Sequence, residues 1–343
     1  PGAHTEPRWP LPFRFDLSEV APATQTTFYV AAIAFGICLI AAIVVAQRKR
    51  DRVLAAIIAV LVVCGIVGGV AARPGIVHAY PTSFYASTQP YSAPSVARGA
   101  PLYTQNCIVC HGVSGRGNGP LAGKLPIRPA DLTEPHLFAH KVGELFWWIS
   151  YGSDSGVMPG FADKLTPDQR WDVINFLLAR AAGDLSEETG SQVSTATALP
   201  LPDFAFEQGG SQSTLSQTLK SGPALVAIFA KPVPRARLDE LAALQPQLAA
   251  AGLRVLAVSV TPLSDTRAPI VGVSRDVRET LSLFRSDTDG GVTELMLDRG
   301  GNVRARWTAS GTGGLANADT LVSDAVRVAR IPVAAANHAG HAH

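Results

Sequence analysis

Two long apolar runs near the start of the sequence constrain the fold more than any other feature. Residues 28–47 and 53–72 are each 20 residues long and contain no charged side chain. A helix of that length spans about 30 Å, which is the thickness of a bilayer core. The two runs therefore predict a transmembrane helix hairpin over 28–72.

The loop between the runs sets the expected orientation of this hairpin. Residues 48–52 read RKRDR, whereas few Lys or Arg residues flank the outer ends of the runs. The positive-inside rule then places the loop in the cytoplasm, and residues 1–27 and the chain after Arg73 on the other side. A signal peptide is excluded because a second apolar run follows at once. We expect a bacterial inner-membrane protein with periplasmic soluble parts.

Length and composition limit the number of domains and the classes of function that the chain can have. The 343 residues suggest two or three domains, and a net charge of +2 with 16% charged residues gives no support for nucleic-acid binding. Two of the four cysteines, Cys38 and Cys64, lie inside the apolar runs and are interpreted as small buried hydrophobes. The chain begins at Pro1 rather than Met, which indicates a processed product or part of a longer membrane protein.

Residues 107–111 read CIVCH, the C-x-x-C-H pattern that attaches a c-type haem. Two thiols three positions apart on a helical turn form thioether bonds to the haem, and the adjacent histidine binds the iron. A zinc site would need a second pair of ligands, and no other cysteine lies outside the apolar runs. We predict one covalent haem c held by Cys107, Cys110 and His111.

The surroundings of this motif suit a haem pocket. Ser95 is expected to cap a helix from Val96 to Cys107, and a glycine-rich loop follows over residues 112–119. Pro120 closes that loop. Its carbonyl would accept the second ring N–H of His111, or it is a plain turn proline.

An electron carrier needs a sixth iron ligand, and the chain has two methionines. Met158 lies in a Gly- and Pro-containing loop, SGVMPGF, that can fold over a haem face, whereas Met296 lies in an apolar run typical of a core strand. His136 and His140 are competing candidates. They are interpreted as surface histidines or as histidines that support an iron ligand without binding the iron themselves. Met158 is the predicted ligand. A thioether ligand raises the reduction potential relative to a second histidine.

These residues resemble the class I cytochromes c over 95–181. The C-x-x-C-H motif, the Gly-Pro loop, Met158-Pro159 and a final helix with Trp171, Asn175 and Phe176 come in that family's order. Five short segments carry a narrower resemblance: YPT at 80–82, SVARG at 95–99, RPADLT at 128–133, FWWI at 146–149 and RWD at 170–172. They resemble the cytochrome part of bacterial proteins that are fused to a copper-resistance protein D (CopD)-like membrane domain. Most of the copper-transport helices of such proteins are absent from this sequence.

The C-terminal part alternates between strand-like and helix-like segments. Strands are predicted at 224–230, 253–260, 292–297 and 303–307, and helices at 237–250, 277–284 and 319–329. This order resembles the thioredoxin and peroxiredoxin fold. Residues 230–235, where that family places its reactive cysteine, read AKPVPR. No proline stands immediately before Val292, where the family places its cis-proline. Thiol–disulfide chemistry is thus excluded, and a docking or structural module is expected.

The predicted architecture is multidomain, with a two-helix transmembrane hairpin, an all-α cytochrome c domain and an α/β thioredoxin-like domain without redox cysteines. The predicted order is an N-terminal periplasmic segment (1–27), the hairpin (28–72), a tether (73–94), the haem domain (95–183), a linker (184–200), the thioredoxin-like domain (201–330) and a His-containing tail (331–343).

The expected function is single-electron transfer at the periplasmic side of a membrane, not catalysis. Its partners would be donor and acceptor proteins or a quinol-linked complex. One alternative is a haem enzyme with an open iron site. Another is a copper-handling or redox-sensing protein, in which His4 and the tail residues His338, His341 and His343 bind copper; an unstructured tail is the competing interpretation.

Overall fold

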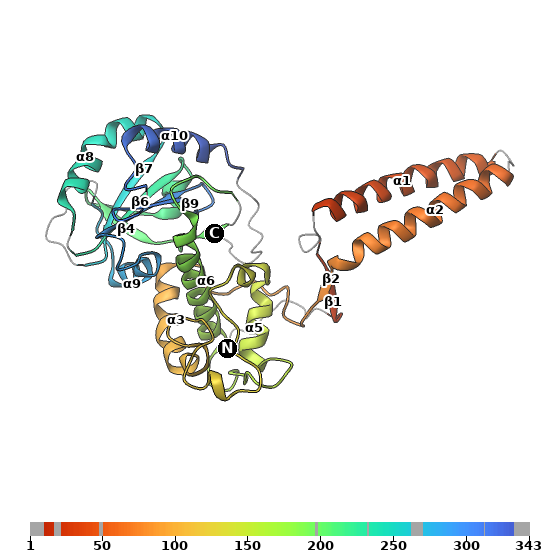
Figure 1. The fold of residues 1–343 in the computed structure, drawn as a ribbon, viewed down its shortest axis with the longest axis horizontal. Coiled ribbons are helices and arrows are strands. Elements are labelled where there is room, and N and C mark those ends of the chain that lie inside the picture. The colour runs from red at the N-terminus through yellow and green to blue at the C-terminus, as the bar shows by residue number, and fades with distance from the viewer. Residues whose placement is uncertain are drawn as a thin grey trace. The chain divides into compact units, whose positions relative to one another are not determined.

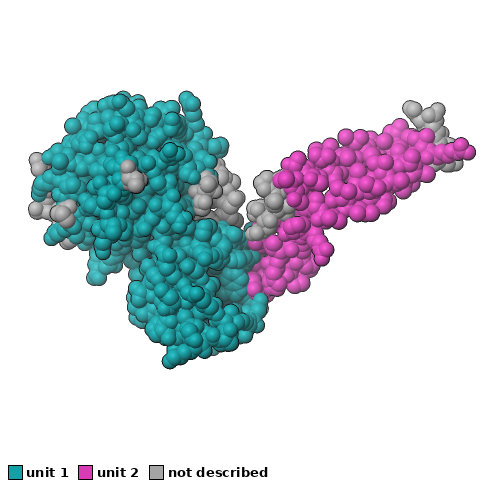
Figure 2. All heavy atoms as spheres, viewed as in Figure 1, with its two compact units in different colours: residues 1–5, 84–343 teal, residues 6–83 magenta. Residues whose placement is uncertain are grey.

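The computed structural model describes residues 10–16, 22–47, 51–195, 198–231, 233–261, 270–311 and 313–332. The chain forms two compact units (Figure 2). One comprises residues 6–83, and residues 84–343 belong to the other.

The first unit contains the two apolar helices, α1 (Pro22–Gln47) and α2 (Asp51–Ala72), which pack side by side (Figure 1). Gly68 permits this approach, since a β-carbon there would lie 3.5 Å from that of Ala31. Both helices are long and apolar enough to cross a membrane, and their outward side chains are exposed, as at Ile40. Helix α1 begins six residues earlier than the apolar run because Pro22 suits a first helical position.

A short two-stranded sheet forms at the open end of this helix pair, where the chain enters α1 and leaves α2. Strand β1 (Phe13–Phe15) pairs antiparallel with β2 (Ile76–His78), which follows the 3-10 turn η2 (Arg73–Gly75). Sequence patterns missed this pairing and predicted an extended segment and an irregular tether. The two strands meet because an antiparallel helix pair brings its entry and exit to the same end.

Four helical segments build the first part of the second unit. They are α3 (Ala93–Asn106), α4 (Ile108–His111), α5 (Val142–Tyr151) and α6 (Pro167–Thr189), with 3-10 turns η3 (Ala122–Lys124) and η4 (Pro135–Ala139) between them. Helix α6 is capped by Thr166, whose side chain accepts from the backbone N–H of Gln169. The predicted cap of α3 is wrong: the helix begins at Ala93, and Ser95 lies inside it.

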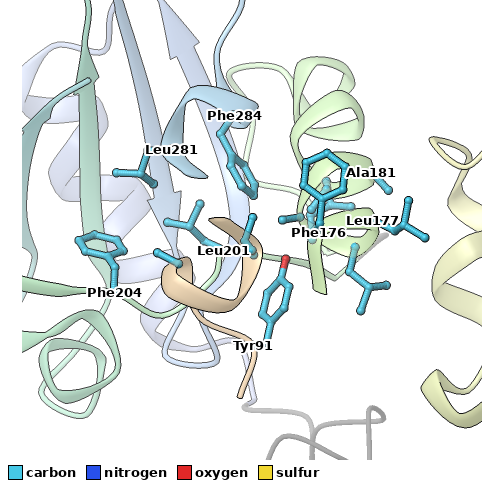
Figure 3. Packing of buried hydrophobic residues seen from close by; sticks show 14 of the residues in the cluster. Tyr91, Phe176, Leu177, Ala181, Leu201, Phe204, Leu281 and Phe284 are labelled. Carbon is cyan, nitrogen blue, oxygen red and sulfur yellow. The ribbon is translucent and has the colours of Figure 1, made fainter. Parts of the chain in front are cut away.

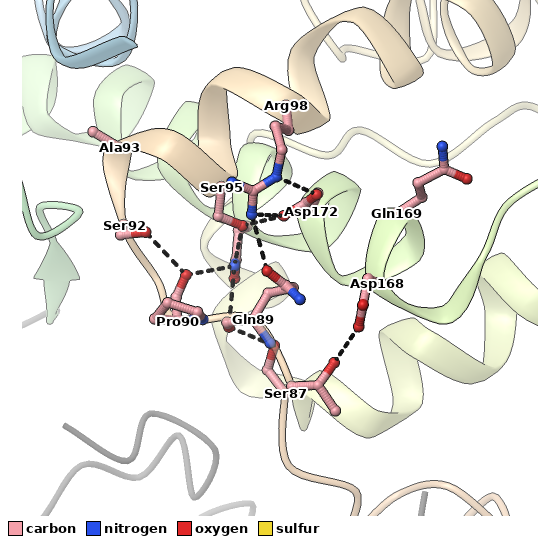
Figure 4. A network of polar contacts seen from close by, with 12 residues as sticks. Ser87, Gln89, Pro90, Ser92, Ala93, Ser95, Arg98, Asp168, Gln169 and Asp172 are labelled. Carbon is pink, nitrogen blue, oxygen red and sulfur yellow. Dashed lines mark hydrogen bonds and ion pairs between the residues drawn. The ribbon is translucent and has the colours of Figure 1, made fainter. Parts of the chain in front are cut away.

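Ser95 instead belongs to a buried polar network (Figure 4). Its hydroxyl donates to Asp172 at 2.6 Å, and the Arg98 guanidinium binds the same carboxylate at 2.8 and 2.9 Å. Asn175 donates to the Ser95 oxygen at 2.8 Å and to the Pro90 carbonyl at 3.1 Å. The network therefore fastens the segment before α3 to the crossing of α3 and α6.

Helices α3 and α6 cross at Gly99, and this contact gives a testable prediction. A β-carbon at Gly99 would lie well inside van der Waals contact with the Asp172 carbonyl oxygen. Helix propensity alone would make Gly99→Ala stabilising by about 1 kcal/mol. Because the clash is with backbone, we expect a net loss of about 1–3 kcal/mol in the free energy of unfolding, measured by urea denaturation.

Gly123→Ala is the matched control for this variant. Gly123 lies in η3, and a β-carbon there would have no atom within 4 Å. Its free energy of unfolding should equal that of the parent protein or slightly exceed it. If the Gly99→Ala and Gly123→Ala proteins are equally stable, α3 and α6 do not approach each other as closely at Gly99 as the structure shows.

Helix α6 extends beyond the predicted haem domain. It runs to Thr189, with Leu185 and Ser186 buried, so the linker predicted at 184–200 begins with helix. The polar composition of this stretch suggested a linker, but its apolar positions pack against the following part of the chain.

That part, the C-terminal module (residues 199–329), is built on a five-stranded sheet. The strand order is β3 (Leu199–Pro200), β9 (Asn302–Thr308), β8 (Val292–Leu297), β6 (Ala224–Phe229) and β7 (Arg254–Ser259). Strands β6 and β7 are parallel, while β8 runs antiparallel to β6 and to β9. The four predicted strands are confirmed, and Met296 is fully buried as expected.

Helices cover both faces of this sheet (Figure 1). On one face lie α8 (Arg235–Ala250) and α10 (Ala318–Ala329). On the other lie α9 (Arg275–Leu281) and the turn η5 (Ser282–Phe284). A hairpin missed by the sequence patterns, β4 (Ala205–Gln208) and β5 (Ser211–Thr214), leads into the short helix α7 (Leu215–Leu219).

One hydrophobic core runs from the helical part, which contains α3 to α6 (residues 93–189), into the C-terminal module (Figure 3). Phe176 of α6 and Tyr91 belong to the same buried cluster as Leu201, Leu281 and Phe284. The Tyr91 hydroxyl also donates to the Pro200 carbonyl at 3.0 Å. The helical part and the C-terminal module are consequently packed as one body rather than joined by a free linker.

Candidate functional site: the C-x-x-C-H turn

The C-x-x-C-H motif lies where α3 ends and α4 begins. Cys107 lies between the two helices, as the C-cap of α3 and the N-cap of α4. Its carbonyl accepts from the N–H of Cys110 at 3.2 Å and from the N–H of His111 at 2.9 Å. This single turn holds the two thiols and the imidazole close in space. All three side chains are partly buried, and both cysteines are free thiols.

The glycine-rich loop (residues 112–119) fixes the backbone after His111. Gly112 has a φ of +78°, a value that suits glycine, and its carbonyl accepts from the buried Tyr103 hydroxyl at 2.7 Å. The Gly117 N–H returns to the His111 carbonyl at 3.0 Å. The loop therefore folds back on the histidine it follows. Tyr103 lies one helical turn before Cys107.

The orientation of His111 is set by a backbone carbonyl. Its Nδ1 lies 3.1 Å from the Ala130 oxygen, so Nδ1–H donates there and Nε2 is left as the unprotonated nitrogen, which could bind a metal. The carbonyl predicted for this role, that of Pro120, was the wrong one. Burial lowers the pKa of His111 despite this hydrogen bond, which favours the neutral imidazole that binds metals.

Ala130 reaches His111 because the backbone of the glycine-rich loop closes on the segment around it. The Leu132 N–H donates to the Gly115 carbonyl at 2.8 Å. A β-carbon at Gly117 would clash with the Pro129 carbonyl, so only glycine permits this approach. The RPADLT segment carries part of the resemblance to a known family, but no sequence pattern shows which carbonyl meets the histidine.

Met158 lies in a tight loop after α5. The Met158 carbonyl accepts from the Ser153 N–H at 3.1 Å, and the Ser153 hydroxyl accepts from the Met158 N–H at 3.1 Å. Gly152 and Pro159 form an antiparallel bridge at the base of the loop. The Met158 side chain is half-buried and packs on the same apolar cluster as Cys107.

The competing histidines already have polar partners. His136 Nδ1 lies 3.1 Å from Glu134, and His140 Nδ1 lies 3.5 Å from Glu144. Both rings are more than a third exposed, as the surface interpretation expects, and that of His140 meets Trp148 edge-on. No group of three or more His, Cys, Asp or Glu side chains able to hold a metal ion occurs in the described part of the chain. His4 and the three tail histidines lie outside it.

The donor set of the turn fits a covalently attached haem. Burial, with a smaller contribution from Cys110, raises the pKa of Cys107 to about 12, so this side chain is a neutral thiol at pH 7. Cys107 and Ile108 pack against a cluster that includes Tyr103 and Leu137. Two thiols, an imidazole with Nε2 available and an apolar wall are the groups that hold haem c.

The C-terminal module contains a buried ion pair between two of its elements. Near the start of α8, the Arg237 guanidinium binds both carboxylate oxygens of Glu294 at 2.7 Å and the Ala316 carbonyl at 2.8 Å. Arg237 is 5% exposed and Glu294 is fully buried. The chain has no cysteine after Cys110, so this module has no thiol chemistry.

Comparison with known protein families identifies the region that contains the C-x-x-C-H turn. Residues 94–177 match the family model described as cytochrome c oxidase, cbb3-type, subunit III. This region is a cytochrome c domain, and it contains the C-x-x-C-H turn and Met158. The match covers about a quarter of the chain. No curated protein matches the sequence.

Several solved structures are similar to parts of the chain. BsSco, of the Sco family of cytochrome c oxidase assembly proteins, is 15% identical over 41% of this chain and 100% of its own (TM-score 0.32). A thioredoxin family protein from Chlorobium tepidum TLS is 22% identical over 39% and 99% (TM-score 0.30). The Kuenenia stuttgartiensis reducing HAO-like complex is 22% identical over 33% and 57% (TM-score 0.24).

Proposed function

We propose that this chain is a membrane-anchored c-type cytochrome that transfers single electrons through one covalently bound haem on the periplasmic side of a bacterial inner membrane. The observation that carries the proposal is the C-x-x-C-H turn, in which His111 is oriented by Ala130 inside a region matching a cytochrome c family. The apolar hairpin supports the anchoring, and the basic residues at 48–52 support the orientation.

Each residue of the site has a distinct role in this proposal. Cys107 and Cys110 would hold the cofactor covalently, and His111 and Met158 would bind its iron. When bound, haem c supplies a one-electron iron couple. The Ala130 carbonyl keeps a proton on Nδ1 of His111, and the surrounding apolar side chains keep water away from the site.

The proposed partners follow from this chemistry. A carrier with two axial ligands has no open iron position for a substrate, so we propose that the protein is not an enzyme. It would instead exchange electrons with a donor and an acceptor, either redox proteins or a quinol-linked complex. The matched family name refers to an oxidase subunit, which suits an acceptor of the respiratory type.

Covalent attachment is the decisive test of the proposal. In cells that mature c-type cytochromes, the full chain should retain haem on a denaturing gel, and its pyridine haemochrome spectrum should be that of a haem with two thioethers. The double variant Cys107→Ser/Cys110→Ser should lose all covalent haem. Attachment takes place on the outer face of the bacterial inner membrane, so covalent haem also supports the orientation.

The chain offers a matched control for this experiment. The double variant Cys38→Ser/Cys64→Ser removes the same number of thiols from the apolar helices and should keep full haem content. The proposal fails if the parent protein carries no covalent haem, or if the Cys107→Ser/Cys110→Ser protein keeps it.

A further inference from the structure

Helix α6 contacts both the glycine-rich loop and the C-terminal module through neighbouring residues. We propose that residues 180–184 of α6 couple the two, so that the C-terminal module holds the glycine-rich loop in place and Arg180 is a positioning residue for His111. This inference rests on the proposed function. It gives the cysteine-free module a role, which is to set the environment of the haem ligand.

The first contact lies between α6 and the glycine-rich loop. Arg180 donates from Nε to the Ser114 carbonyl at 2.9 Å, and one turn later Asp184 forms an ion pair with Arg116 at 3.5 Å. Within the loop, Gly117 returns to the His111 carbonyl at 3.0 Å. A displacement of residues 180–184 would therefore reach the backbone of His111 through two hydrogen bonds.

The second contact lies between the same turn of α6 and the C-terminal module. A β-carbon at Gly183 would fall well inside van der Waals contact with the Leu283 carbonyl in η5. Ala181 and Ala182 are fully buried, and so is Phe284. Figure 3 shows Phe284 facing the α6 residues Phe176 and Ala181. The packing leaves no room for α6 to move closer to the module.

Further bonds prevent the module from moving independently of α6. Directly after the helix, the Gly190 carbonyl accepts from the Arg306 N–H of β9 at 2.7 Å, and the Ser194 N–H donates to the Arg304 carbonyl at 2.7 Å. Residues 180–184 also lie beyond the matched cytochrome region, which ends at residue 177. The coupling thus belongs to the way this chain joins its two parts.

The test is a double-mutant cycle on the midpoint potential of the haem in the full chain. Gly183→Ala pushes α6 away from Leu283, and Arg180→Met, which has no donor, removes the bond to Ser114. Each variant should shift the potential, whereas Arg180→Lys, which keeps a donor, should shift it less. If Gly183 acts through Arg180, adding Gly183→Ala to Arg180→Met should cause little further shift.

A control at the same interface separates this coupling from general loosening. Thr280→Val removes the 3.1 Å bond from the Thr280 hydroxyl to the Ala93 carbonyl, which joins α9 to α3 without touching residues 180–184. It should lower stability and leave the potential unchanged. If Gly183→Ala does not fold, Phe284→Leu takes its place in the cycle, because it reduces the side chain that packs between η5 and α6.

The outcomes distinguish this inference from the proposed function. An unchanged potential in folded, haem-bearing Gly183→Ala protein would overturn the coupling, and so would fully additive shifts in the cycle. Both results leave the cytochrome assignment standing. A parent protein without covalent haem would instead refute the proposed function itself.

Discussion

Replacing Met158 with alanine should open the sixth coordination position of the haem. The thioether raises the reduction potential, so the midpoint potential of Met158→Ala should fall. The long-wavelength absorption of a sulfur–ferric iron bond should disappear, and the ferrous protein should change from excluding carbon monoxide to binding it stoichiometrically. The fold should survive, because the Met158 side chain is only half-buried and its loop is held by backbone contacts with Ser153.

The only other methionine provides the control for this experiment. Met296→Leu changes a fully buried side chain of β8 and should leave the haem spectrum unaltered. If Met158→Ala keeps the parent spectrum while His136→Ala or His140→Ala changes it, the sixth ligand is a histidine. Carbon monoxide binding by the unaltered protein would favour a haem enzyme with an open iron site.

Removing the partner of a buried carboxylate should have the largest effect on stability. Arg237→Met leaves Glu294 fully buried without its two 2.7 Å bonds, and we expect a loss of about 3–5 kcal/mol in the free energy of unfolding. Replacing both residues, as Arg237→Met/Glu294→Leu, removes the stranded charge. Most of the lost stability should return, as measured by urea unfolding followed by circular dichroism.

The effect of Arg237→Met should depend on pH. Burial already raises the pKa of Glu294, and Arg237 is the group that opposes this rise. Without the guanidinium, the pKa of Glu294 rises further in the folded protein, which then binds a proton more tightly than the unfolded chain. The variant should therefore be closest to the parent at acidic pH and lose stability as pH rises through that raised pKa. A destabilisation that is equal at pH 5 and pH 8 would contradict this account.

Local patterns predicted much of this protein because they act within a few residues. Apolar runs of 20 residues predicted α1 and α2, and alternation and spacing predicted the strands and helices of the C-terminal module. The C-x-x-C-H spacing alone places two thiols and an imidazole on one turn. Segments whose partners lie far away in sequence were missed, as with β1, whose apolar face is too short to signal a strand without β2.

The sequence by itself determined the chemistry of this chain: which side chains can hold a haem, and that no thiol follows Cys110. Only the tertiary structure decided which carbonyl orients His111, because Ala130 and Pro120 differ in spatial position and not in chemistry. It also decided that residues 184–189 are a packed helix rather than a linker. The close approach at Gly183 shows the physical reason, since such a contact depends on a backbone carbonyl 100 residues away, which no local pattern can encode.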